Sequence, residues 1–350
     1  MSTIPPQVTV MLADPKMRLS HLLWHGVREL WMRLDDATQK KFIKQFGKKW
    51  VPPRPSRDKA GNIIEDNNAG LDFLYMHREM ICMVNCMLED VGGRPIKGWE
   101  RLPRACSREF PAALDYRLPP DDYLSKDDGF WEDRILRGAE KLLSESSLKY
   151  ISLAKLGTVI EFTVHAAMHQ RFGGYSTSGD LRPGQADLLR KLDKRFNRVW
   201  YDTLLDAYSA HVDPLFWKIH GWIDAQIIAW EQYHDPVDWD AWMGPMSHCK
   251  MHMDSANGGH EVGEDMHDHA HAHPEEEDVK VEELVSVLAF LAPYGLDGFF
   301  HVREADLEQI SNSPNFLTVR GPFAEPKMFV PKAVVAGREG ASADADIDSA

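Results

Sequence analysis

The stretch that decides the fold is residues 207–234, AYSAHVDPLFWKIHGWIDAQIIAWEQYH. An Asp-Pro pair, Asp213 and Pro214, divides it, and apolar residues then follow at helical spacing. Asp is a common N-cap and proline is favoured at the first helical position, so we expect a helix from Pro214 to about residue 233. His220 lies alone on the apolar part of that helix. A buried histidine there needs a hydrogen-bond partner or a metal ion.

A second histidine-bearing block, GTVIEFTVHAAMHQRFGG, occupies residues 157–174. His165 and His169 are four positions apart, so on a helix they share one face and can hold one metal ion. Imidazole binds copper, zinc, iron and nickel, so the spacing does not select the metal. The same spacing also fits two helix histidines with unrelated roles.

Taken together, the two blocks resemble the second copper-site signature of the tyrosinase, catechol oxidase and hemocyanin family. The family pattern YSA-x-x-DP-x-F-x-x-H-x-x-x-D is matched at Tyr208, Ser209, Ala210, Asp213, Pro214, Phe216, His220 and Asp224. The other block is similar to the family's G-x-x-x-E-x-x-x-H-x-x-x-H segment, which closes on Gly-Gly. The resemblance implies that one copper ion is bound by His165, His169 and His220, and that Glu161 is a catalytic residue holding a water beside the metals.

Other residues of the matched block have expected roles around the metal. Phe216 and Trp217 are expected to wall the site and limit water. Asp224, one turn after His220, has two interpretations that stay open: it orients groups around the site, or it forms a salt bridge with an arginine.

The first copper site of the family is matched less completely. Residues 71–93, LDFLYMHREMICMVNCMLEDVGG, are similar to the family's F-x-x-x-H-R helix, and the resemblance makes His77 the third ligand there. The family places two more histidines between its opening helix and this one, and here none occurs from residue 26 to residue 76. Asn68 stands nine residues before His77, where relatives carry a ligand.

His21 and His25 are the upstream candidates, and they too are four positions apart. Arthropod-type hemocyanins use such a pair in their first site, which favours ligation. The pair nevertheless precedes VRELWMRLDDATQKKFIKQF, the part similar to the family's opening helix, and that is the wrong side for a ligand. We therefore favour a histidine pair packed at the start of a helix. The predicted metal ligands are His77, His165, His169 and His220.

Periodicity predicts a mainly α protein, a tyrosinase-like helical bundle core with irregular loops and a few short strands. Helices are expected at about residues 20–50, 71–93, 131–144, 150–171, 184–212, 214–233 and 281–293, and strands at NFLTVRG and KMFVPKAVVAG. The expected divisions are an N-terminal extension (1–19), a tyrosinase-like copper-binding domain (20–240), a His/Met-rich flexible segment (241–279), a C-terminal helix with short strands (280–335) and a disordered tail (336–350).

Residues 247–278 have a composition of their own. They hold seven of the sixteen histidines, four of them in HDHAHAH, among acidic residues. Such a tract binds divalent metals and Cu(I) loosely. Two interpretations stay open: a solvated polar linker, or a segment that gathers and delivers metal.

Charge and composition exclude other classes. The formal net charge is −14, and no basic stripe occurs, so we expect no nucleic-acid partner. The N-terminus does not look like a secretory signal, and no apolar run reaches 18 residues, so we expect no membrane association. Four cysteines do not make a disulfide framework in a chain of 350 residues. A reducing, cytoplasmic location is the expectation.

The expected function is that of a copper-dependent, tyrosinase-like oxidoreductase acting with dioxygen on a phenolic, catecholic or o-aminophenolic substrate. Copper is the expected cofactor, two ions if the first site is intact and one otherwise. Monophenol-hydroxylating relatives often carry Asn at the position of Ala166, so monophenols are disfavoured. The expected partners are a small aromatic substrate, dioxygen and a copper donor protein. The alternative is a degenerate single-copper, non-catalytic or copper-delivery protein that uses the His-rich segment.

Overall fold

The computed structural model describes residues 4–105, 124–174, 193–236, 279–295 and 302–312. These residues are mainly helical, as predicted. No strand forms among them, and an isolated antiparallel bridge joins Arg57 to Ile63. The expected strands, the His-rich segment and the C-terminal tail all fall outside the described residues.

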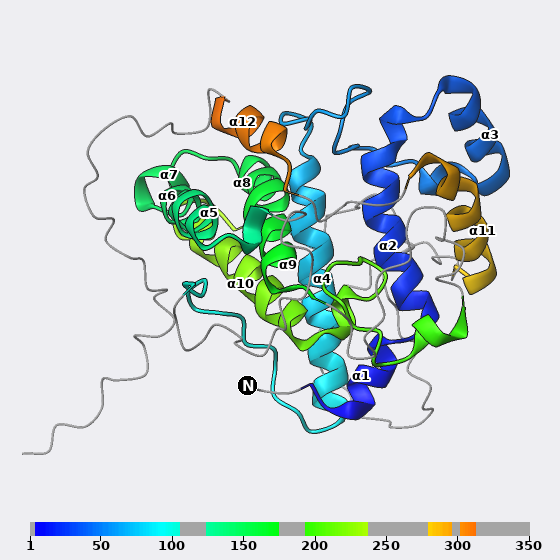
Figure 1. Cartoon of the computed structure of the whole chain (residues 1–350), viewed down its shortest axis with the longest axis horizontal. Coiled ribbons are helices and arrows are strands. Elements are labelled where there is room, and N and C mark those ends of the chain that lie inside the picture. The colour runs from blue at the N-terminus through cyan, green and yellow to red at the C-terminus, as the bar shows by residue number, and fades with distance from the viewer. Residues whose placement is uncertain (1–3, 106–123, 175–192, 237–278, 296–301, 313–350) are drawn as a thin grey trace, which may run out of the picture.

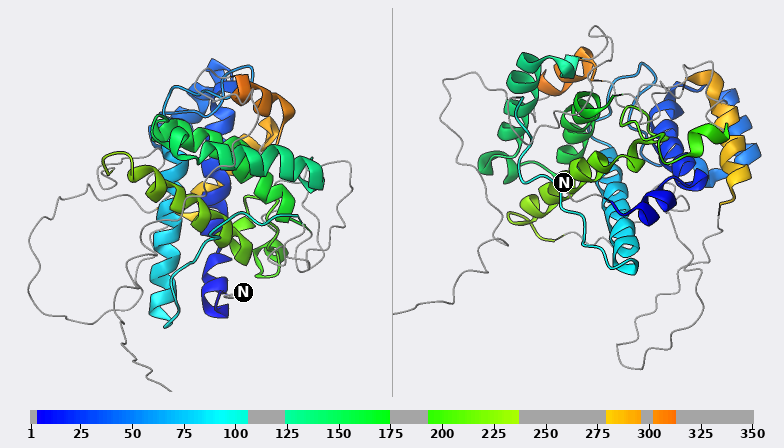
Figure 2. Two further views of the ribbon diagram at one scale, coloured as in Figure 1. Left: turned by 90° about the vertical axis from the view of Figure 1, so that its left-hand side faces the viewer. Right: turned by 60° about the horizontal axis from the view of Figure 1, so that its bottom comes forward.

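The main helical elements follow one another along the whole described chain. They are α1 (Pro6–Leu12), α2 (Pro15–Leu30), α3 (Asp36–Phe46), α4 (Ala69–Asp90), α5 (Asp128–Phe130), the π-helical η4 (Trp131–Leu136), α6 (Arg137–Leu142), α7 (Glu145–Leu148), α8 (Leu153–Ile160), the π-helical η5 (Glu161–His165), α9 (Ala166–Phe172), α10 (Pro214–Glu231), α11 (Val281–Leu291) and α12 (Glu304–Asn312). Helix α4 lies at the centre, with α5–α9 on one side, α2, α3 and α11 on the other, and α10 crossing it (Figures 1 and 2).

Helix α4 contacts both α8 and α10, and its approach to α8 is unusually close. A Cβ atom on Gly70 would lie 2.0 Å from the carbonyl oxygen of Ala154, and one on Gly157 would lie 2.2 Å from the carbonyl oxygen of Gly70. Only glycine fits at both positions. The two glycines therefore allow the backbones of α4 and α8 to touch, which sets the spacing between His77 of α4 and the histidines of η5 and α9, the helical turns that continue α8.

The helix expected over residues 20–50 is broken in two, so this prediction is wrong in its extent. Helix α2 begins earlier, where the side chain of Asp14 accepts a hydrogen bond from the amide of Lys16, and ends at Leu30. After a 3-10 turn, Asp35 caps α3 by accepting from the amide of Thr38 at 2.7 Å. An N-cap requires extended backbone, so Asp35 interrupts a pattern that is otherwise helical throughout.

The expectations for α4, α10 and α11 are confirmed within a few residues. Helix α10 begins as predicted, with Pro214 in its first turn and an Asp213 oxygen 2.8 Å from the amide nitrogen of Leu215. Helix α11 packs against α2 and α3, and its apolar side chains belong to the main hydrophobic core. None of the helices in the described ranges is both long and apolar enough to cross a membrane.

The helix expected over residues 184–212 is wrong for its described part, which begins at residue 193. Only two 3-10 turns occur there, Lys194–Asn197 and η8 (Ala210–Val212). The buried Arg18 of α2 donates to the carbonyl oxygens of Arg198, Tyr201 and Tyr208. These tertiary hydrogen bonds compete with helical ones, and the local Asp and Ser side chains add further bonds to the backbone.

Candidate metal centre

Six histidines from four parts of the fold meet in the interior, between α2, α4, α10 and the continuous η5–α9 helix. They are His21 and His25 on α2, His77 on α4, His165 at the end of η5, His169 on α9, and His220 on α10. None of these side chains is more than 2% exposed. The four histidines predicted as metal ligands therefore lie in one place. His21 and His25, which were not predicted as ligands, lie there with them.

Two overlapping sets of three have ligand atoms that all lie within 4.8 Å of one another. One set is His21, His25 and His77; the other is His77, His165 and His220. Because His77 belongs to both sets, the two adjoin. Cysteine and the acidic residues contribute to no such set within the described ranges.

The interpretation of His21 and His25 as a pair at the start of a helix is wrong in its geometry. Both lie in the middle of α2, and the segment similar to the family's opening helix begins in the last turn of that same helix. Their rings are 6.2 Å and 5.6 Å, centroid to centroid, from that of His77. The pair therefore lies beside His77, in the interior.

His169 occupies a slightly different place from the one that the sequence predicts. Its ring centroid lies 4.5 Å from that of His165 and 5.5 Å from that of His220. The set whose ligand atoms all lie within 4.8 Å of one another nonetheless includes His77 and not His169. All three predicted ligands of the second site are thus in ring contact, with His77 close beside them.

The tautomers of several of these rings are fixed by main-chain carbonyls. Nδ1 lies 2.8 Å from a carbonyl oxygen in each of three cases: His77 with Phe73, His169 with Leu204, and His220 with Phe216. A carbonyl oxygen only accepts hydrogen bonds, so Nδ1 carries the proton and Nε2 of the neutral ring carries a lone pair. Metal-binding histidines are oriented in this way by their second nitrogen.

The Nε2 atoms of His165 and His220 face each other at 3.2 Å. Nδ1 of His165 lies 3.4 Å from the carbonyl of Glu161, so both rings place their Nδ1 toward a carbonyl. Two lone pairs then point at each other, which is unfavourable unless a cation lies between them. Nitrogens bound at about 2.0–2.1 Å to one tetrahedral ion are roughly 3.3 Å apart, so the observed spacing fits a shared metal.

Burial lowers the pKa of all six histidines below the usual value, to about 4 for His21 and about 3 for His169. In addition, neighbouring histidines lower the pKa values of His25, His77, His165 and His220. The rings are therefore neutral at pH 7, which is the form that binds a metal ion. In the same interior, Nε2 of His21 and Nε2 of His77 have no hydrogen-bond partner. A buried polar atom without a partner is costly, and a bound metal removes that cost.

Aromatic rings surround the histidines. The ring of Phe216 stacks on that of His220, with centroids 3.7 Å apart, and Phe73 lies 4.6 Å from His77. Trp24 lies edge-on to His25. The expected wall at Phe216 is confirmed, and Trp217 packs behind it, 4.9 Å from the Phe216 ring. These rings make the surroundings of the ligand nitrogens apolar.

The carboxylate of Glu161 has a partner that the sequence did not predict. Its two oxygens accept from Arg28 of α2, at 2.7 Å and 3.2 Å, and both side chains are buried. Burial raises the pKa of Glu161 against the pull of this guanidinium. Burial acts to lower the pKa of Arg28, but the carboxylates of Glu161, Asp72 and Glu29 together outweigh it and the net shift is upward. The catalytic, water-holding role of Glu161 stays a prediction.

A second ion pair confirms one interpretation of Asp224. Its oxygen lies 2.6 Å from Nε of Arg78, the residue after His77, so the pair joins α4 to α10 beside their two histidines. Asn68, which stands at the position of a family ligand, instead adopts a left-handed conformation (φ 63°) at the start of α4.

The sequence analysis missed His211. This fully buried histidine lies 3.2 Å from His21, Nδ1 to Nδ1. It falls within the matched block, at a position where the family pattern fixes no residue, so the resemblance gave no reason to select it. The available signal was a histidine two residues before the Asp-Pro pair.

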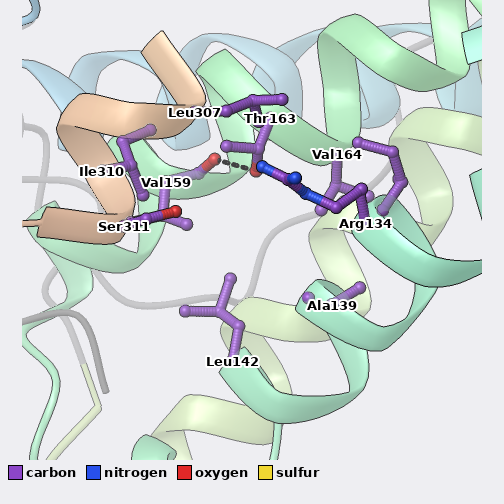
Figure 3. A pocket seen from close by; sticks show the side chains of 11 residues that line it. Arg134, Ala139, Leu142, Val159, Thr163, Val164, Leu307, Ile310 and Ser311 are labelled. Atoms are coloured by element: carbon purple, nitrogen blue, oxygen red, sulfur yellow. Dashed lines mark hydrogen bonds between the residues drawn. The ribbon is translucent and has the colours of Figure 1, made fainter. Parts of the chain in front are cut away.

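A small pocket of about 70 Å³ lies beside η5, the turn that carries His165 (Figure 3). Thr163 and Val164 of η5 line it together with residues of α6 and α12, such as Leu142 and Ile310. None of the six histidines lines it. The π-helical turn η5 therefore contributes Glu161 and His165 to the buried centre and a different pair to this hollow.

No known protein-family model matches the chain, and no curated protein matches it significantly.

Proposed function

We propose that the protein is a copper-dependent oxidoreductase that holds two copper ions in the histidine centre and oxidises o-diphenols or o-aminophenols with dioxygen. The single observation that supports it is the meeting of six buried, neutral histidines, five of which form two groups that share His77, with His169 in ring contact with His165 and His220. Imidazole suits copper, and three imidazoles leave a coordination position open for other molecules.

His21, His25 and His77 would hold one copper ion, and His165, His169 and His220 the other. When bound, the copper pair supplies two-electron redox chemistry between dioxygen and the substrate. In the overall reaction two o-diphenols lose two electrons and two protons each, and one dioxygen is reduced to two waters. The chain's own contribution is to hold the six rings with their lone pairs inward and to keep the surroundings apolar.

Two residues near His165 in the chain, Glu161 and Ala166, support the proposed substrate class. Arg28 occupies both oxygens of Glu161, which weakens this carboxylate as a base for a phenol proton. Ala166 is buried and has no side chain that could hold a water. An o-diphenol is oxidised without hydroxylation of its ring. Such a site therefore suits an o-diphenol better than a monophenol.

A second candidate is a non-catalytic copper protein. None of the six rings is more than 2% exposed, which disfavours delivery of copper from this centre; the alternative of delivery by the His-rich segment concerns residues outside the described ranges. A non-catalytic protein that binds two copper ions has the same ligands as the oxidase. Only turnover separates the two.

The test is an oxygen-consumption assay of the copper-loaded protein with a catechol, an o-aminophenol and tyrosine. We expect turnover with the first two and slow or absent turnover with tyrosine. His165→Gln should be inactive, and His234→Gln, which changes a histidine bonded to the carbonyl of Leu148, should be active and serves as the matched control. Absence of oxidation by protein that holds two copper ions would favour the non-catalytic candidate.

A further inference from the structure

Residues 203–212, here called the 203–212 turn, contact one histidine from each copper group. The carbonyl oxygen of Leu204 lies 2.8 Å from Nδ1 of His169. His211 lies 3.2 Å from Nδ1 of His21. The turn therefore holds the outer nitrogens of two candidate ligands that are 148 positions apart in the chain (169 minus 21).

The contact at His211 allows one arrangement of protons. Nε2 of His211 lies 2.9 Å from the carbonyl oxygen of Leu12, so it must donate. Nδ1 of the neutral His211 ring then carries a lone pair and accepts from Nδ1 of His21. His21 in turn presents a lone pair at Nε2, which has no hydrogen-bond partner, and His21 belongs to the group with His25 and His77. The carbonyl of Ala207 also favours a proton on His21.

The 203–212 turn is fixed to the helix that carries His21. Arg18, three residues before His21, donates to the carbonyl oxygens of Tyr201 and Tyr208 at 3.0 Å and 3.3 Å. Within the turn, the hydroxyl of Ser209 donates to the carbonyl oxygen of Thr203. His211 is thereby held at a set distance from α2, which the contact with His21 requires.

We propose that His211 is a positioning residue that fixes the tautomer and orientation of His21 as a ligand of the first copper ion. His77, His169 and His220 are held at Nδ1 by carbonyl oxygens alone, whereas Nδ1 of His21 meets a second imidazole. His211 itself is no ligand, because one of its nitrogens donates to Leu12 and the other accepts from His21. The metal-binding part of this inference rests on the proposed function, but the tautomer part does not.

The experiment compares His211→Gln with His211→Leu. Glutamine keeps an acceptor and a donor on one side chain, whereas leucine removes both and leaves Nδ1 of His21 without this acceptor. His234→Leu is the control for loss of a histidine elsewhere. Two quantities are measured: the tautomer of His21 in the metal-free protein, by long-range ¹H–¹⁵N NMR, and the copper bound per chain with its EPR signal, by titration with Cu(II) alone.

We expect His21 protonated at Nδ1 and His211 at Nε2 in the wild type. Affinity for one of the two copper ions should fall about 10- to 100-fold in His211→Leu, as for other residues that orient a ligand, with the remaining ion EPR-visible. His211→Gln should stay within a few-fold of the wild type. A wild-type His21 protonated at Nε2 overturns the proposal, and this result does not depend on any variant folding. A folded His211→Leu variant that binds both copper ions with wild-type affinity also overturns the proposal. A wild type that binds fewer than two ions would contradict the proposed function, while the tautomers would still test His211.

Discussion

The Nε2 atoms of His165 and His220 lie 3.2 Å apart, although the residues are 55 positions apart in the chain and on different helices. Each ring places its Nδ1 toward the carbonyl four residues earlier. That arrangement leaves two lone pairs facing each other in an apolar interior. It is unfavourable in the metal-free protein and favourable once a cation is shared, so the two rings could hold one metal ion between them.

The first prediction concerns His220. His220→Ala should remove about one equivalent of copper per chain without unfolding the protein, because alanine is tolerated well in a helix. Elemental analysis of the purified variant gives the copper content, and circular dichroism checks the fold. His234→Ala should keep the wild-type copper content. An unchanged copper content in His220→Ala would show that this residue is not a ligand.

The second prediction concerns the pair on α2. His21→Ala or His25→Ala should remove the other copper ion, because each residue supplies a ligand atom to the group with His77. The remaining Cu(II), no longer coupled to a neighbour, should give an EPR signal. If both variants keep two copper ions and remain EPR-silent, His21 and His25 only pack in the interior and are not ligands, and the first copper site lies elsewhere.

His21 and His25 also show how much of this centre could be predicted from the sequence. The patterns around His165, His169 and His220 are local, so their spacing and the Asp213 cap could be recognised directly. His21 and His25 could not be placed, because the end of α2 and the start of α3 depend on which of several polar residues becomes a cap. The contact of His21 with His211 depends on the 203–212 turn, whose shape is set by Arg18, far away in the sequence.

The third prediction concerns the buried pair of Arg28 and Glu161. Arg28→Met leaves the buried carboxylate without its counter-charge and should lower the free energy of unfolding by about 3–5 kcal/mol. Arg28→Met combined with Glu161→Gln should be less destabilised than the sum of the two single variants, because neither charge then remains buried. Chemical denaturation of all four proteins measures this. Strict additivity would show that the two side chains do not interact.

The fourth prediction is the pH dependence of the metal-free protein. Burial holds the pKa values of His21 and His169 at about 4 and 3, below the usual 6.5 of the unfolded chain. The unfolded state therefore binds more protons below pH 6.5. The stabilisation is fully present above that pH and is lost as the pH falls toward 4 and then 3. Each such histidine contributes up to about 1.4 kcal/mol per pH unit.

Denaturation midpoints of the metal-free protein between pH 7.5 and 4.5 check this dependence. His169→Gln removes one of the titrating groups, so its stability should fall less steeply with decreasing pH than that of the wild type. A stability that is flat over this range would mean that the six rings are accessible to protons in the folded state, contrary to their burial.

The most direct test of the central claim, that six histidines form a two-copper centre, is a copper count combined with EPR on the same wild-type sample. The metal-free protein is loaded with excess Cu(II), freed of loosely bound metal by a mild chelator, and measured for copper per chain. We predict two copper ions per chain and little EPR signal, because the two Cu(II) ions lie close enough to couple magnetically. One copper ion per chain with a full EPR signal, or none, would contradict the account.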